Sequence, residues 1–476
     1  MVLSAVAVLF LGVSRSNPPG FFRDESAIAL NARTIAERGE DEYGSSWPLY
    51  FRSFGDYKSP TYVYALAGVF AVWEPGIVAA RVLSALFGLA GVLLLGVLVG
   101  RLTSPVAGVL TAVAAGLNPW LFEVSRLVFE VALLPLAVVL SLLAVERLRT
   151  RSRWSATDVV PLGASFGLMA YTYPTGRLFA PLLALGLAVW VRRVGWRSVA
   201  TAWLAVAVVL VPIVAYTLVH PGALTSRYRA TTYVSGDLSA LEIARRFLGH
   251  YVANLDLWTW VVVGDSNSRH HVGGGGSILA GIALLAVLGF VVAVARRRHD
   301  PWWRFALYAL AVSVVPASLT VDRFHTLRLV PFGVLLLLFA GLGIATLVET
   351  RPRRATLIAG GLVSILVAGQ ALYFQERYRT LDDERRDAFE AAYPDVLRAA
   401  ARRGPVYVRS EDETSAHALW YGALQRLSPP VRRLPPGAPV PPGGVLVGEL
   451  DPCRGCILVD RREPFSAYQA RTSPSP

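Results

Sequence analysis

Residues 82–100 read VLSALFGLAGVLLLGVLVG, a run without a single charged side chain. A run of about 18 or more apolar residues is long enough to cross the hydrocarbon core of a bilayer as one helix. A second run of this kind lies at residues 330–348. We therefore expect a membrane protein built from helices.

Apolar runs recur along most of the chain, which has 476 residues, 54% of them hydrophobic and only 17% charged. Soluble domains average about 25% charged residues. The composition predicts an all-α polytopic membrane domain at 1–374 with about eleven crossings. The expected spans are 1–14, 80–100, 105–121, 128–146, 158–173, 178–191, 198–219, 277–295, 304–319, 329–348 and 355–374. We interpret the first as a membrane anchor, because a signal peptide would begin with charge and end in a small-residue cleavage site.

Arginine is concentrated in every second loop between these runs. Short cytoplasmic loops carry an excess of Lys and Arg, so these loops and the N-terminus are expected in the cytoplasm. The net charge of +13 is thereby explained by topology, and we expect no nucleic-acid partner. The segments expected outside are 15–79, 119–127, 173–178, 220–276, 320–328 and the tail from 375.

Two regions do not follow the pattern of spans. Residues 61–73 are apolar but too short to cross the bilayer upright, so they predict an interfacial or re-entrant helix. Residues 375–468 are charged and Pro-rich, and the strand-like pieces PVYVRS and GGVLVGEL predict a small extracytoplasmic α/β domain before a disordered end at 469–476. Within it, Cys453 and Cys456 can form a disulfide, bind zinc or stay free; an outside location favours the disulfide.

The first outward segment, 15–79, carries the richest set of polar residues. Asp24 and Glu25 precede apolar residues at helical spacing, such as Ile28 and Ile35, which predicts an amphipathic helix along the membrane interface. Carboxylates at the start of a helix can serve chemistry or simply cap it.

Other outward loops also hold ionisable residues. Arg126 and Glu130 are four positions apart, so we expect them on one helix face, either as a structural pair or as functional groups. Four glycines, at 273–276, follow a polar loop and either let a ligand approach the backbone or make the loop flexible. The remaining candidates are Arg177, Asp265, Arg269, His270, His325 and Arg328.

Outward arginine runs against the positive-inside bias, so each of these residues is informative. The planar guanidinium suits phosphate oxygens. Cations and carboxylates together at the depth of the lipid headgroups indicate an anionic, lipid-linked substrate and acid–base chemistry.

Seven strings carry a family resemblance in their order and spacing. They are FFRDESAIALNARTI, FRSFGDYKSPTYVYAL, AARVLSALFG, NPWLFEVSRLVFE, YTYPTGRLFAPLL, GDSNSRHH and FHTLRLVPFGVLLL. Over residues 1–375 the chain resembles bacterial GT-C glycosyltransferases of family 39, the group of protein O-mannosyltransferases and the aminoarabinose transferase.

The resemblance implies a polyprenyl-phosphate-sugar donor used at the outer face of the cytoplasmic membrane. It implies that Asp24, with Glu25, acts as catalytic base in an inverting transfer, and that Lys58, Arg126 and Arg328 bind the donor phosphate. The sugar would be mannose or a related hexose or pentose, and the acceptor a hydroxyl of a protein, a glycolipid or a polysaccharide.

Several alternatives stay open at this point. Asp24 and Glu130 could hold a divalent metal ion, although no ligand cluster in the sequence requires one. A transporter or flippase for lipid-linked sugars is the main rival function, and a non-catalytic cell-envelope assembly protein is the other. Transporters often show repeated halves, which we do not find here.

Overall fold

The computed structural model describes residues 2–14, 16–349, 354–380, 383–449, 453 and 455–471. The chain forms two compact units, and each is described by itself. The helical unit comprises Met1–Gly12, Ser59–Tyr62 and Ser84–Thr380, and the mixed unit comprises Val13–Lys58, Val63–Leu83 and Leu381–Pro476. Most of the predicted outward segment 15–79 therefore belongs to the same compact unit as the C-terminal region. The sequence analysis had included this segment in the membrane domain at 1–374.

The helical unit has a helix at each apolar run expected from the sequence. Several of these helices begin with proline in the first turn, where its missing N–H is not needed. The longer elements are α1 (Val2–Leu11), α4 (Ile77–Leu102), α5 (Pro105–Gly116), α7 (Leu134–Leu148), α8 (Ala156–Thr172), α9 (Pro174–Leu185), α11 (Trp196–Val219), α13 (Ala240–Leu255), α14 (Ala280–Arg296), α15 (Pro301–Ser313), α17 (Val330–Glu349) and α18 (Arg354–Arg379). Short turns join them: α6 (Pro119–Val124), η1 (Glu130–Leu133), η2 (Gly186–Trp190), α10 (Val191–Val194), η3 (Ala223–Thr225), α12 (Ser226–Thr231), η4 (Thr259–Val263) and α16 (Val315–Ser318).

Six helices of the described residues are long and apolar enough to cross a membrane. They are Ile77–Leu102, Glu130–Leu148, Pro174–Val194, Trp196–Val219, Val330–Glu349 and Leu357–Arg379. The predicted all-α membrane fold is therefore confirmed. The other expected spans are shorter helices, such as α5 and α14, so the full count of eleven crossings stays a prediction.

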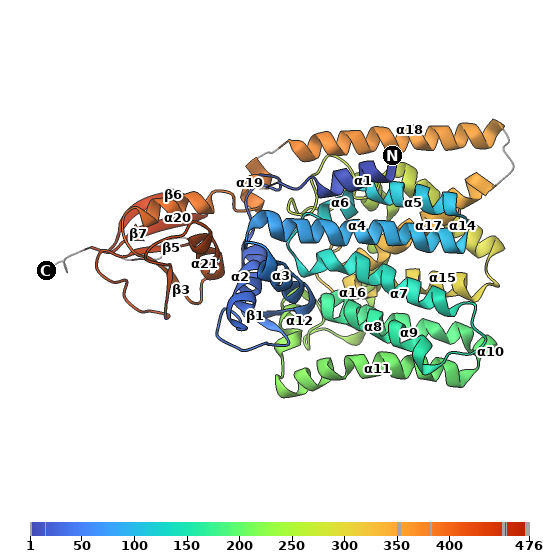
Figure 1. The fold of residues 1–476 in the computed structure, drawn as a ribbon, viewed down its shortest axis with the longest axis horizontal. Coiled ribbons are helices and arrows are strands. Elements are labelled where there is room, and N and C mark those ends of the chain that lie inside the picture. Colours follow the sequence, from blue (N-terminus) through green and yellow to red (C-terminus); the bar gives the residue numbers. More distant parts are fainter. Residues whose placement is uncertain are drawn as a thin grey trace. The chain divides into compact units, whose positions relative to one another are not determined.

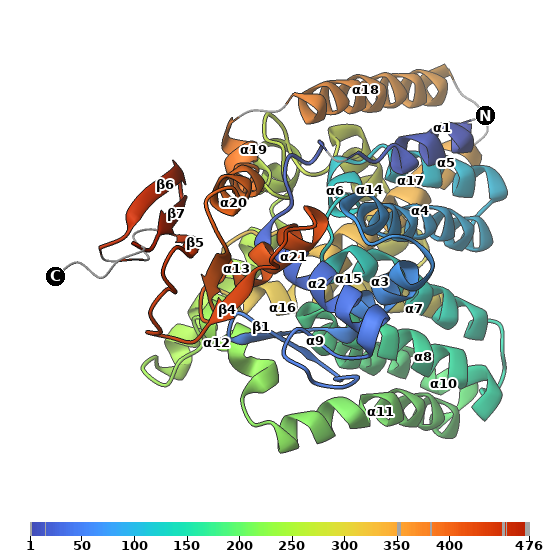
Figure 2. The same cartoon turned by 60° about the vertical axis from the view of Figure 1, so that its left-hand side comes forward.

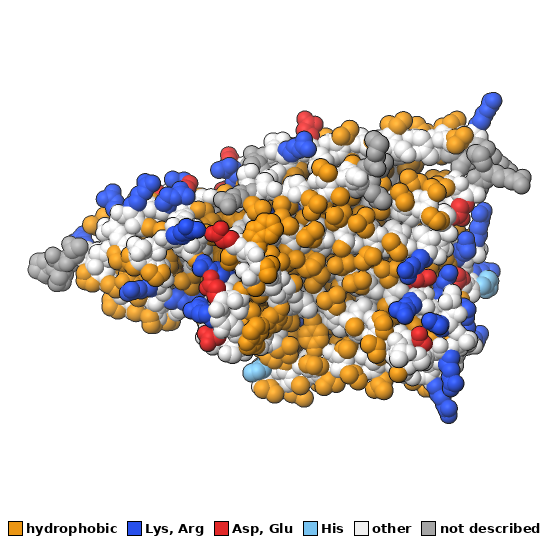
Figure 3. All heavy atoms as spheres, in the orientation of Figure 1, with side chains coloured by type: hydrophobic (Ala, Val, Ile, Leu, Met, Phe, Trp, Pro, Cys, Tyr) orange, Lys and Arg blue, Asp and Glu red, His pale blue; other side chains and the backbone are white. Residues whose placement is uncertain are grey.

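The surface of the helical unit is apolar where a bilayer would surround it. Figure 3 shows hydrophobic side chains spread over the helices, with Lys and Arg gathered at the end where Figure 1 labels α10. On α11, Leu204, Val211 and Leu218 are 63%, 59% and 75% exposed. Such a contiguous apolar surface is rare on soluble proteins and is typical of contact with lipid.

The centre of the helical unit is α17, which packs closely against α14. A Cβ atom at Gly289 would overlap the carbonyl oxygen of Phe339, and one at Gly343 would overlap that of Leu285. Small residues let two membrane helices approach until their backbones touch. These two glycines therefore fix the spacing of α14 and α17.

The mixed unit combines α2 (Arg23–Arg38), the hairpin of β1 (Phe51–Ser53) and β2 (Asp56–Lys58), α3 (Pro60–Val72) and a five-stranded sheet. The sheet order is β4-β3-β5-β7-β6, and β3 is parallel to both of its neighbours. Figure 2 shows the antiparallel pair β6–β7 at one edge of this sheet. Its elements are α19 (Asp383–Ala388), α20 (Tyr393–Ala401), β3 (Val406–Arg409), α21 (Ser415–Leu424), β4 (Arg432–Leu434), β5 (Val445–Glu449), β6 (Ile457–Arg462) and β7 (Phe465–Gln469).

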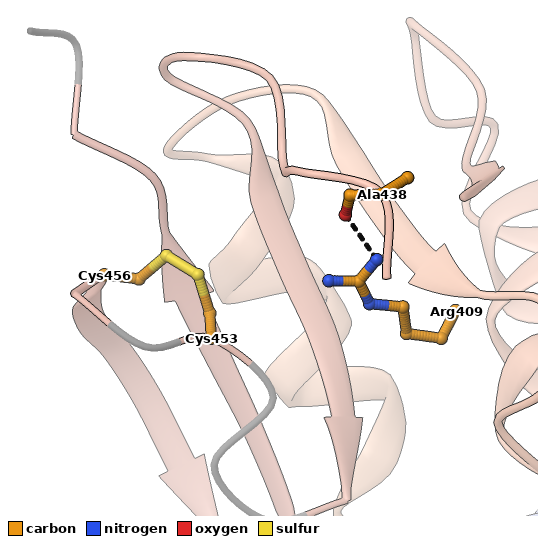
Figure 4. Close-up of a disulfide and its surroundings, with 4 residues drawn as sticks. All are labelled: Arg409, Ala438, Cys453 and Cys456. Carbon is orange, nitrogen blue, oxygen red and sulfur yellow. Dashed lines mark hydrogen bonds between the residues drawn. A yellow bond between two sulfur atoms is a disulfide. The ribbon is translucent and has the colours of Figure 1, made fainter. Parts of the chain in front are cut away.

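The two predicted strands, PVYVRS and GGVLVGEL, are confirmed as β3 and β5. Cys453 and Cys456 form a disulfide, the alternative that an outside location favoured (Figure 4). The disordered end was predicted to begin at residue 469, which is one residue too early, because Gln469 is the last residue of β7. Its residues 472–476 lie outside the described part of the chain.

The predicted helix after the first span is confirmed as α2, but its expected environment is wrong. Ala27, Ile28 and Ile35 are at most 3% exposed, because this side of α2 packs on α21. Ser26 also hydrogen-bonds His417 of α21, with 2.7 Å between Oγ and Nδ1. The apolar side of α2 therefore contacts protein and not lipid.

Candidate active site

Asp24 and Lys58, predicted as base and phosphate ligand, meet in the mixed unit. Asp24 lies in the first turn of α2, and Lys58 is the last residue of β2. The hairpin turns through Phe54 and Gly55, both with positive φ, as a two-residue turn requires. Lys58 Nζ lies 2.8 Å from Asp24 Oδ1, and the two side chains are 12% and 29% exposed. A half-buried ion pair of this kind presents an acid and a cation together to a polar ligand.

Glu25 has a different environment from Asp24. It is fully buried, and its Oε2 accepts a hydrogen bond of 2.8 Å from the N–H of Phe22, the residue before α2. This contact satisfies a donor that the start of the helix leaves open. The geometry therefore matches the capping alternative for Glu25.

In the helical unit, Glu130 and Arg177 both contact Ser59. The N–H of Ser59 donates to Glu130 Oε1, and Arg177 Nη2 donates to Ser59 Oγ over 2.9 Å. Arg177 also donates to the carbonyl of Leu224, at 3.3 Å. Two ionisable residues from separate predicted outward loops thus meet at the residue that follows Lys58 in the chain.

The expectation that Arg126 and Glu130 share a helix face is wrong. Helix α6 ends at Val124 and the next helical turn starts at Glu130, after Phe129 has adopted an extended backbone. The carbonyl of Leu127 accepts a hydrogen bond from Ser84 Oγ, at 2.7 Å, instead of continuing a helix.

Arg126 is 2% exposed and holds the end of α1. Its guanidinium lies 4.3 Å from the ring centre of Phe122 and donates to the carbonyls of Leu9 and Phe10, in the last turn of that helix. A cation is favourable at this end of a helix dipole. Arg126 therefore anchors the C-terminal end of α1 through these contacts.

Asp265, His270 and His325 form a compact cluster in the helical unit. Asp265 Oδ2 accepts hydrogen bonds from the N–H and hydroxyl of Thr326, at 2.7 and 2.8 Å, and lies 3.2 Å from His270 Nδ1. The rings of His270 and His325 stack with their centres 4.9 Å apart. Burial, with the nearby His270 and Arg328, lowers the pKa of His325 to about 3, so its imidazole is neutral.

This cluster is also the place where described residues could hold a metal ion. Each of the three side chains offers one ligand atom, and these atoms lie within 4.8 Å of one another. Two imidazoles and one carboxylate are a donor set that suits zinc and related transition-metal ions. The alternative pair, Asp24 and Glu130, stays a prediction.

Arg328 and Arg269 make contacts inside their own loops. Arg328 Nη1 lies 2.6 Å from Asp322 Oδ2 and 2.8 Å from Thr320 Oγ1. Arg269 Nε donates to Asn267 Oδ1 at 3.2 Å. The donor-phosphate role of Arg328 therefore stays a prediction, as does a binding role of Arg269.

The sequence reasoning missed Arg23, the neighbour of Asp24. Its guanidinium forms ion pairs with Glu390, Glu413 and Glu449. Burial raises the pKa of Glu390 to about 7, although Arg23 opposes the shift. No local pattern could have revealed this cluster, because Glu390 is 367 positions away from Arg23.

Comparisons with known proteins agree with this architecture. The model of the dolichyl-phosphate-mannose-protein mannosyltransferase family matches residues 57–218. No curated protein sequence matches the chain. The structure of ArnT from Cupriavidus metallidurans bound to undecaprenyl phosphate is 15% identical and covers 98% of this chain and 97% of its own, with a TM-score of 0.61.

An oligosaccharyltransferase from Archaeoglobus fulgidus shares the fold less completely. Its apo structure is 12% identical and covers 90% of this chain but 64% of its own, with a TM-score of 0.56. The chain has the GT-C membrane fold of these solved transferases. This is the fold that the sequence resemblance predicted.

Proposed function

We propose that this protein transfers a sugar from a polyprenyl-phosphate-sugar to an acceptor hydroxyl at the outer face of the cytoplasmic membrane. ArnT was solved with undecaprenyl phosphate, and AglB of Archaeoglobus fulgidus with a dolichol-phosphate and an inhibitory peptide. The observation that carries the proposal is the ion pair between Asp24 and Lys58, because it joins a base to a phosphate-binding cation.

In the proposed reaction, the carboxylate of Asp24 takes the proton of the acceptor hydroxyl while its oxygen attacks the anomeric carbon. The bond from that carbon to the phosphate oxygen breaks, and its electron pair leaves with the polyprenyl phosphate. Attack from the opposite side inverts the anomeric configuration. Lys58 stabilises the negative charge of the departing phosphate.

Glu130 and Arg177 are proposed as positioning residues. Their hydrogen bonds restrain Ser59, the residue directly after Lys58. Mannose is the first sugar to test, because the matching family model is that of a mannosyltransferase. Proteins, glycolipids and polysaccharides of the cell envelope are the acceptors to test.

The experiment is a transfer assay with radiolabelled polyprenyl-phosphate-mannose in membranes that contain the protein. We expect D24N to lower the rate by about a hundredfold or more, since a general base contributes 10²–10⁴-fold. E37Q is the matched control, because Glu37 is an exposed carboxylate on the same helix. Wild-type rates in D24N at equal protein amount would remove Asp24 from the mechanism, and movement of intact lipid without transfer would favour a flippase.

A further inference from the structure

A cavity of about 210 Å³ lies in the helical unit between the loop at 271–276 and the C-terminal end of α18. Its polar lining comes from His271, four glycines, Gln370, Tyr373 and Arg377. The described lining residues include no carboxylate. The cavity therefore offers a small, cationic and donor-rich site.

Arg377 supplies the permanent charge. Its Nε is buried and has no hydrogen-bond partner among the described residues. A buried guanidinium N–H without a partner is costly, and an anion in the cavity would satisfy it. Arg377 thus faces the cavity with unused capacity to bind an anion.

His271 adds a second basic group. Its Nδ1 lies 3.9 Å from Glu123 Oε2, and the carboxylate is fixed by a hydrogen bond of 2.7 Å from the N–H of Val272. The His271 side chain is buried, at 6% exposure, and lines the cavity.

The glycines bring backbone donors close to Arg377. Gly273 and Gly274 have positive φ, and a Cβ at Gly274 would lie 3.1 Å from Tyr373 Oη and 3.3 Å from Arg377 Nε. No hydrogen bond described within this structure uses the N–H groups of Gly273, Gly274 or Gly275. Successive backbone N–H groups in such a turn are a common binding site for phosphate.

The cavity lies beside α18, a helix with exposed apolar side chains. Leu362, Ile365 and Leu372 of α18 are 62–72% exposed, and Tyr373 at the cavity is 49% exposed. Figure 1 shows α18 at the margin of the helical unit. An acyl or prenyl chain lying along α18 would bring its head group to Arg377.

We propose that this cavity binds the phosphate head group of a membrane lipid. The phosphate would accept hydrogen bonds from Arg377 and the glycine N–H groups, while the apolar chain contacts α18. The lipid could be a bilayer phospholipid or a polyprenyl phosphate; only the second case rests on the proposed function.

The test measures lipid binding to the purified, delipidated protein by native mass spectrometry. The probes are phosphatidylglycerol, undecaprenyl phosphate and undecaprenol, which has the same chain without phosphate. We expect both phosphate lipids to bind and undecaprenol to bind at least tenfold more weakly, since a hydrogen bond to a charged group is worth about 1.5–3 kcal/mol. Equal binding of undecaprenol would overturn the proposal without any variant.

R377Q should weaken binding of phosphatidylglycerol about tenfold, whereas R379Q, an exposed arginine in the same helical turn, should leave it unchanged. G274A offers a second variant with an intact charge, and its Cβ should weaken binding by crowding Arg377. Unchanged binding in both R377Q and G274A would contradict the site. K58Q should still bind phosphatidylglycerol while its transfer rate falls, so failure of this site and failure of the proposed function are distinguished. A preference for undecaprenyl phosphate over phosphatidylglycerol assigns the site to the carrier, and equal binding assigns it to bilayer lipid.

Discussion

Asp24 and Lys58 are 34 positions apart in the chain and 2.8 Å apart in the fold. Lys58 is also the only lysine of a chain in which Lys and Arg together number 46. A lysine is a compact point charge, whereas arginine is a planar fork, so the two are not equivalent at a phosphate site. The residue that the resemblance assigned to the donor phosphate is therefore chemically distinct from every other strong cation in the protein.

K58Q should reduce kcat/KM for the polyprenyl-phosphate-sugar by about 10- to 100-fold, because it removes a charge-assisted contact of about 1.5–3 kcal/mol. Initial rates measured against donor concentration would show it. K58R keeps the charge and should recover part of the loss. A K58Q enzyme with wild-type donor kinetics would argue against the phosphate role.

The cluster of Arg23 and Glu390 should make stability depend on pH. Burial raises the pKa of Glu390 from about 4.5 to about 7, so the folded chain keeps a proton that the unfolded chain has lost in this range. The free energy of unfolding contributed by Glu390 is therefore present below pH 4.5 and is lost as the pH rises through about 7.

Melting temperatures of the purified protein at pH 5 and pH 8 provide the measurement. From pH 5 to pH 8, the melting temperature of the wild type should fall by a few degrees more than that of E390Q, whose side chain at 390 cannot titrate. Burial lowers the pKa of the neighbouring His417 and acts in the opposite direction, but His417 is present in both proteins. Identical pH profiles would show that Glu390 does not titrate in this range.

At the scale of elements, α14 and α17 pack closely against each other. In α17, 89% of the residues in its apolar 18-residue stretch are buried, and Gly289 of α14 leaves no room for a side chain. In membranes, helix association depends on such close packing rather than on the hydrophobic effect. These two helices therefore form the rigid centre of the helical unit.

G289A should destabilise the protein by about 1–3 kcal/mol, the usual cost of overpacking a core. G360A is the matched control, because Gly360 lies in α18 and a Cβ there would meet no atom within 4 Å. Thermal unfolding in detergent would compare the two. A G289A protein as stable as G360A would mean that α14 and α17 are not packed as described.

At the scale of the whole molecule, the proposed function depends on which side of the membrane each loop occupies. On the face that Figure 3 shows, apolar side chains spread over the helical unit and basic side chains gather at one of its ends. From the positive-inside bias we expect that basic end in the cytoplasm. A prenyl-linked donor at the outer face then requires the first outward segment to be outside.

Cysteine labelling would test this orientation. The native cysteines are first replaced by serine, and one cysteine is then added as S152C or D237C. Position 152 lies in the Arg-rich loop between the expected spans 128–146 and 158–173, position 237 lies in the expected outward segment 220–276, and both are exposed. A membrane-impermeant maleimide should label D237C and not S152C in intact cells. The reverse pattern would exclude the proposed reaction at the outer face.

The sequence by itself determined where the helices form. Hydrophobicity along a run is a local property, so each expected span has a helix, and the short apolar strands β3 and β5 were equally readable. The prediction that Arg126 and Glu130 share a helix face failed for a local reason. Phe129, between them, has an extended backbone that no spacing rule reveals.

Only the tertiary structure decided which side chains meet. Glu130 reaches Ser59 across 71 positions, and Arg23 reaches Glu390 across 367, because long-range packing joins them. The cavity at Arg377 has the same origin, since its glycine loop and α18 are distant in sequence. Periodicity encodes which face of an element is apolar, but the partner of that face is selected by the packing of the whole chain.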